Sequence, residues 1–87
     1  MIVPTIHLNG TSGKALLEQV TDARFQALKL VDALVSMAPN GRDYYPQGQT
    51  ALKQAQGENN NRIAMVKSVC DELAVLAGKI ADAMDPQ

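Results

Sequence analysis

The chain has 87 residues, which suits one small domain, since single domains usually contain about 100–150 residues. Hydrophobic residues make up 46% of the sequence and charged residues 20%, which is the composition of a globular protein rather than of a disordered tail. The chain has eight Lys and Arg residues and nine Asp and Glu residues, so it lacks the basic excess that docking on duplex nucleic acid requires. No apolar run approaches the roughly 20 residues of a membrane span, so a membrane is not an expected partner either.

The first twelve residues predict an extended lead-in, because Pro4 and Gly10 disfavour a helix there. Thr11 or Ser12 then offers a hydroxyl that can cap the N-terminus of a helix. Apolar residues follow at alternating spacings of three and four, which predicts an amphipathic helix over residues 13–38. Its apolar stripe contains Leu17, Val20, Ala27, Val31, Leu34 and Ala38.

Residues 39–48 predict a polar connector, whose Pro39 ends the first helix. The apolar spacing resumes beyond the connector and predicts a second helix over residues 49–84. Its stripe contains Leu52, Ala55, Val66, Val69, Leu73, Leu76, Ile80 and Ala83. Segment 57–61 is rich in Gly and Asn, which are poor helix formers, so a break there that gives three helices is the alternative. The terminal residues 85–87, with their proline, are expected to stop the helix.

These elements predict an all-α fold in which a single domain, residues 1–87, forms an antiparallel helical hairpin. A lone hairpin of this size buries too little apolar surface to offset the conformational entropy that folding removes. The wide apolar stripes therefore predict a homo-oligomeric helical bundle, so the first expected partner is the chain itself.

Residues suited to catalysis are sparse. The chain has one His, His7, and one Cys, Cys70, and neither belongs to a spacing typical of a metal site or a nucleophile. Cys70 lies beside the apolar stripe, which favours a buried, inert thiol. We therefore expect no enzyme activity, no catalytic residue, no bound metal and no cofactor.

The connector carries the residue types best suited to binding. Tyr44 and Tyr45 each offer a ring and a hydroxyl, and Arg42 offers a planar fork for phosphate or carboxylate. Such side chains hold nucleotides or anchor protein interfaces. The alternative is structural, with the tyrosines packed onto the helix ends and Arg42 paired with Asp43 or a carbonyl.

Three polar residues fall at stripe positions of the two helices. They are Arg24, Asn59 and Arg62. Symmetric pairing about the connector would place Arg24 near Ile63 and bring all three polar side chains to one level. A buried guanidinium requires an anionic partner. Asp22, Glu58 or a carboxylate of another subunit would supply it, and a bound anion such as a phosphate at an oligomer interface is the alternative.

Two strings, PTIHLNGTS at residues 4–12 and NGRDYYPQG at residues 40–48, resemble small proteins of tailed phages and prophages. The resemblance covers roughly residues 4–84. Small helical, oligomeric phage proteins often act against host defence by sequestering nucleotide signals or masking a host protein. The resemblance thus implies a cytoplasmic location in a bacterial host. The chain lacks the sequence pattern of helical-hairpin sponges for cyclic nucleotides, so the resemblance assigns no binding residues.

We therefore expect a non-enzymatic anti-defence protein that sequesters a small anionic, nucleotide-like signal molecule. The candidate ligand contacts come first from the connector and then from the stripes: Arg42, Tyr44, Tyr45, Arg24, Arg62 and Asn59. The alternative is a protein–protein interaction module, either an inhibitor of a host defence complex or an accessory part of a virion. In that case the connector tyrosines and arginine would anchor the interface.

Overall fold

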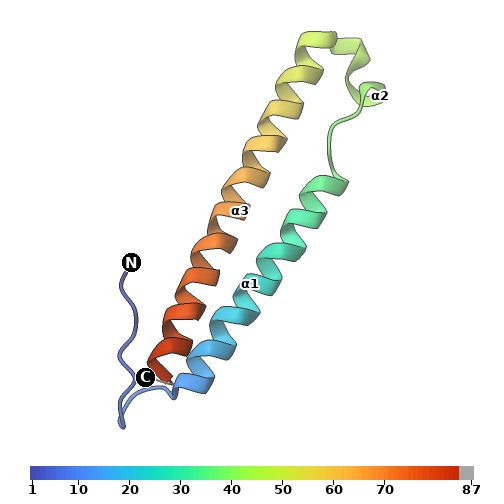
Figure 1. The fold of residues 1–87 in the computed structure, drawn as a ribbon. Coiled ribbons are helices and arrows are strands. Elements are labelled where there is room, and N and C mark those ends of the chain that lie inside the picture. Colours follow the sequence, from blue (N-terminus) through green and yellow to red (C-terminus); the bar gives the residue numbers. More distant parts are fainter. Residues whose placement is uncertain (85–87) are drawn as a thin grey trace.

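The computed structural model describes residues 1–84, in which every regular element is helical. Helix α1 spans Gly13–Ser36, and the short helix α2 spans Gly41–Tyr44. A 3₁₀ turn, η1, follows at Tyr45–Gln47, and the long helix α3 spans Gln49–Met84. Helices α1 and α3 lie side by side and run in opposite directions (Figure 1). The predicted all-α fold is confirmed.

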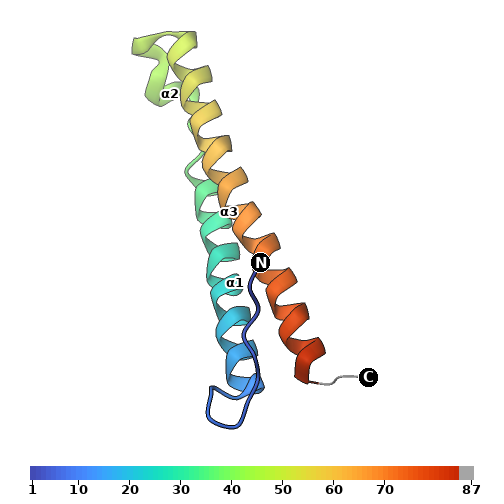
Figure 2. The same cartoon turned by 90° about the vertical axis from the view of Figure 1, so that its left-hand side faces the viewer.

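The N-terminal arm, residues 1–12, is extended apart from one turn, in which Gly10 N–H donates to the carbonyl of His7 at 3.1 Å. The arm turns at the start of α1 and runs back beside the C-terminal part of α3 (Figures 1 and 2). Ser12 caps α1, since its Oγ accepts a hydrogen bond from Ala15 N–H at 3.1 Å. Of the two candidate caps, the structure therefore uses Ser12.

Gly13 is buried where the arm, the start of α1 and the end of α3 meet. A Cβ atom at this position would lie 2.6 Å from Met84 Cγ and 2.9 Å from Ile6 Cδ1. Both distances are below van der Waals contact, so a side chain here would force the side chains of Met84 and Ile6 to shift. The absence of a side chain is what permits this close approach.

Helix α1 ends at Ser36, two residues before the predicted end at residue 38. Pro39 has no N–H to donate, and Ala38 N–H bonds to the carbonyl of Val35 at 3.2 Å. Within residues 1–84, the carbonyl of Leu34 consequently receives no backbone N–H. A carbonyl at a helix end requires another donor when it is buried.

The connector is more ordered than the polar loop expected over residues 39–48. Asn40 caps α2, because its Oδ1 accepts a hydrogen bond from Arg42 N–H at 3.0 Å. Pro46 lies in the first turn of η1, where its missing N–H leaves no bond unmade. Gly48 then takes a φ of +94° and directs the chain into α3.

Helix α3 passes through residues 57–61 without a break, so the expected helix over 49–84 forms as one piece. The additional helix of the structure is α2 in the connector. Gly57 has no positive φ, and a Cβ atom added to it would meet nothing within 4 Å. The expected stop at 85–87 lies outside the described residues.

Two hydrogen bonds between side chains and backbone show how α1 and α3 align. Arg24 Nε donates to the carbonyl of Cys70 at 3.2 Å, and Asn59 Nδ2 donates to the carbonyl of Leu34 at 2.9 Å. The predicted register, with Arg24 near Ile63, is therefore wrong by about two helical turns. The physical reason is that α2 and η1 pack beside the first turns of α3, so α3 extends past the end of α1.

The seam of α3 also differs from the predicted stripe. Cys70 is buried, as expected, whereas Val69 is 47% exposed and Arg62 is exposed. The seam has thus moved by one residue at these positions. Burying Arg62 would remove a guanidinium from water without a partner, whereas the observed seam keeps Arg62 in solvent and turns Ile63 inward.

The resulting molecule is a thin rod of 62 × 20 × 18 Å. Its radius of gyration is 18.9 Å, against about 12 Å for a compact domain of this length. Among the described residues, four hydrophobic side chains are classed as buried. They are Val31, Leu34, Cys70 and Ile80. The helices are therefore held together by a narrow seam rather than by a full core.

Two glycines, Gly57 within α3 and Gly48 directly before it, test this description of the helix and its start. Gly57→Ala should raise the free energy of unfolding by about 0.5–1 kcal/mol, because Ala is the better helix former and meets no atom. Gly48→Ala should lower it by about 1–2 kcal/mol, because an L side chain is strained at a positive φ. Urea unfolding followed by circular dichroism measures both. A break in α3 at residue 57 would remove the gain in Gly57→Ala.

Candidate functional site

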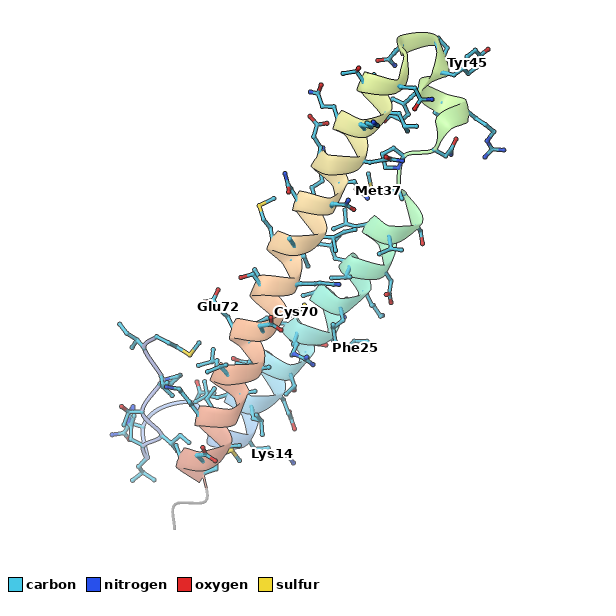
Figure 3. The ribbon with its side chains drawn as sticks, turned by 45° about the horizontal axis from the view of Figure 1, so that its top comes forward. Lys14, Phe25, Met37, Tyr45, Cys70 and Glu72 are labelled. Atoms are coloured by element: carbon cyan, nitrogen blue, oxygen red, sulfur yellow. The ribbon has the colours of Figure 1, made fainter. Side chains whose placement is uncertain are left out.

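The tip of the hairpin carries both tyrosines, but they differ in exposure. Tyr44 is half-buried, while Tyr45 is 79% exposed at the end of the rod (Figure 3). A pocket of about 140 Å³ lies between the connector and the start of α3. It is lined by Gly41, Tyr44, Tyr45, Gly48, Gln49 and Leu52. Ligand sites usually measure about 300–1,000 Å³, so this pocket is too small to enclose a nucleotide.

Arg42 does not line that pocket. Its side chain is exposed, and its Nε lies 3.5 Å from Asn40 Oδ1, which is long for a hydrogen bond. The connector therefore places Arg42 and Tyr45 on the outer surface of the tip instead of gathering Arg42 and both rings around one cavity. Charge and aromatic surface are available here for a partner that docks on the outside.

Asn59 belongs to the seam and is 1% exposed. Its Nδ2 donates to the carbonyl of Leu34, the group that the end of α1 leaves without a backbone donor. Asn59 therefore caps the C-terminus of α1 from a different helix. Its Oδ1 is buried and has no hydrogen-bond partner among residues 1–84. The structure thus gives Asn59 a structural role that its position in the sequence did not indicate.

The three polar stripe residues do not meet at one level. Arg24 reaches the carbonyl of Cys70, and Cys70 lies eleven residues along α3 from Asn59, which is about 16 Å. Arg62 faces solvent. The acceptor that the fold supplies to Arg24 is a neutral backbone oxygen, which is neither of the anionic partners considered from the sequence. The expected cluster of Arg24, Asn59 and Arg62 is therefore not formed within one chain.

A second hollow, of about 280 Å³, lies beside Asn59 where α1 ends. It is lined by Ala38, Pro39, Gln56, Asn59 and Asn60. The buried Oδ1 of Asn59 is shielded from solvent, so this acceptor is not displayed to a ligand. The hollow forms because α1 ends early and α3 extends past that end.

Other chemical features of residues 1–84 are few. In this part of the chain, no three His, Cys, Asp or Glu side chains gather in a way that could hold a metal ion. The helices of the same residues are too short or too polar to cross a bilayer. Cys70, the one thiol, is buried between the helices.

No known family matches the chain, and comparison with curated proteins and with solved structures finds no match either. The resemblance to tailed-phage proteins therefore stays a prediction.

Asn59→Ala tests the cap that joins the two long helices. The substitution leaves the buried carbonyl of Leu34 without a donor, so the free energy of unfolding should fall by about 1–3 kcal/mol. Asn60→Ala, an exposed neighbour of the same type, should change it by less than about 0.5 kcal/mol. Urea titrations of both variants provide the comparison. Equal stabilities of the two variants would show that Asn59 does not cap α1.

Proposed function

We propose that this protein is a non-enzymatic binding module that recognises a protein partner through the tip of its hairpin. One observation carries the proposal: the ring of Tyr45 is 79% exposed, and an exposed Arg42 lies three residues before it in the same connector. Tyr and Arg are the residues, together with Trp, that most often contribute the large binding energies in protein interfaces.

The tip is organised before any partner binds. The Asn40 cap before Tyr45 and the ring of Pro46 directly after it restrict the backbone on both sides of Tyr45. Tyr44 is half-buried against the start of α3 and supports the same turn. Binding to a preformed turn costs less conformational entropy than ordering a flexible loop. An exposed tip whose pocket is too small to enclose a nucleotide matches a protein surface better than it matches a small molecule that must be enclosed.

The resemblance to tailed-phage proteins suggests the setting of this proposal. In that setting the partner is a protein of the bacterial host, such as a component of a defence complex, and the module acts by masking it. Catalysis has no part in this mechanism.

Sequestration of a small anionic, nucleotide-like molecule is the second candidate function. It is favoured by Arg42, whose guanidinium makes one long contact among residues 1–84, to Asn40 Oδ1. A planar guanidinium free of a close partner suits phosphate oxygens. Because the adjacent pocket is small, this function requires tips from more than one chain to enclose the ligand.

The decisive variant for the protein partner is the double substitution Arg42→Ala with Tyr45→Ala. Both side chains are exposed, so the double variant should keep the stability and helix content of the parent chain. Affinity capture from a bacterial lysate, followed by purification of the captured protein, yields the partner for binding measurements. We expect the double variant to weaken its binding by at least about 100-fold, since two hot-spot residues are lost.

Gln47→Ala is the matched control, because Gln47 is exposed on the same tip and carries neither charge nor ring. It should bind as the parent chain does. Equal binding by the double variant and the parent would exclude the tip as the interface. A rise in melting temperature with cyclic nucleotides or inorganic phosphate, lost in Arg42→Ala, would instead support the second candidate.

A further inference from the structure

We propose that a second copy of this chain packs on one particular face of the α1–α3 pair and completes a four-helix bundle. The proposal concerns the sides of the rod and goes beyond the function proposed for its tip. It is built from the seam, from the rows of residues that flank it, and from the surface area of the chain.

The seam residues recur with a seven-residue period in both helices. In α1 the period runs through Leu17, Arg24 and Val31, and in α3 it runs through Ile63, Cys70 and Ala77. The residue just before each of these positions lies on one flank of its helix. Both helices are right-handed and they run in opposite directions, so these preceding residues lie on the same side of the pair.

We call this set the flanking row, and it forms one face of the rod. Its members are Leu16, Ala23, Leu30 and Met37 from α1, with Arg62, Val69, Leu76 and Ala83 from α3. Seven of the eight are apolar. Leu30, Met37 and Val69 are about half exposed, whereas Leu16 and Leu76 are partly covered near the end where the arm lies. Helices in a bundle carry apolar residues at the seam and on one flank, and this chain has the same distribution of apolar residues.

The opposite flank of the pair is more polar. The row with the same seven-residue spacing on this flank also has eight members. Half of them are hydrophilic: Lys14, Thr21, Asn60 and Lys67. Beyond that row, Phe25 is already covered on one side, since Lys29 Nζ lies 4.7 Å from the centre of its ring. The flanking row is the more apolar of the two rows, so we assign the second copy to it.

The surface area of the chain is large enough to include such a contact. The chain exposes 6425 Å², whereas a compact folded chain of 9.3 kDa exposes about 5,000 Å². The excess of about 1,400 Å² exceeds the roughly 800 Å² that each partner contributes to a standard interface. A second hairpin supplies two helices of the same length with the same apolar row. It therefore matches the part of the face that the arm leaves open, and the result has the four-helix architecture in which each helix buries a wide stripe.

The test compares two valines of α3 that have similar exposure on different faces. Val69 belongs to the flanking row and is 47% exposed, and Val75 lies on the outer face and is 52% exposed. Light scattering of the parent chain at micromolar concentration should give twice the monomer mass of 9.3 kDa. Val69→Lys should raise the dimer dissociation constant at least 100-fold, and Val75→Lys should leave it unchanged.

A second measurement needs no substitution and does not depend on whether a variant folds. Met37 in the flanking row and Met1 in the arm are 58% and 62% exposed in the single chain. Dilute peroxide should oxidise Met37 several-fold more slowly than Met1 where the dimer forms. The difference should vanish on dilution to the monomer.

Four results would overturn the proposal. Three of them are a monomeric mass with an intact helical spectrum, a mass above that of a dimer, and dissociation by Val75→Lys with none by Val69→Lys. Equal oxidation of Met37 and Met1 in the dimer would also overturn it. The tip proposal is tested separately, because the Arg42 and Tyr45 double variant should remain a dimer.

Discussion

The hydrogen bond from Asn59 to the carbonyl of Leu34 is the constraint on which the arrangement of the hairpin depends. Pro39 denies the end of α1 a backbone donor, and a buried carbonyl must find one elsewhere. Because the donor comes from α3, this bond caps one helix and holds it against the other in the register that the connector allows. In that register α3 extends beyond the end of α1, and α2 and η1 pack against the extension.

Because α3 extends past the end of α1, the two surfaces to which we assign roles lie far apart. Tyr45 lies at the extreme end of the rod, and Val69 lies twenty residues along α3 from its first residue, about 30 Å away. A second chain packed along the flanking row therefore leaves the tip accessible. In such an assembly each copy presents its own Arg42 and Tyr45, and multivalent binding raises the overall affinity without any new contact.

The narrow seam between α1 and α3 is the physical basis of the dimer that we propose. Cys70 and Ile80 are among the few hydrophobic side chains that the pair buries, while apolar residues such as Leu30 and Val69 remain half in water. Two helices in contact along one line cannot cover stripes that are three residues wide. The dimer that we propose would supply the missing cover.

The sequence by itself determined the two long helices, because the spacing of apolar residues and the caps act over a few neighbouring positions. A hydroxyl cap at Thr11 or Ser12, a second helix over 49–84 and the burial of Cys70 follow from such local patterns, whereas the choice of Ser12 and the helix α2 in the connector do not. Only the tertiary structure decided the register, the cap that Asn59 provides to α1, and the solvent position of Arg62. These features depend on where a connector with its own helical turns places α3 against α1, and that geometry is set by contacts between residues far apart in the chain.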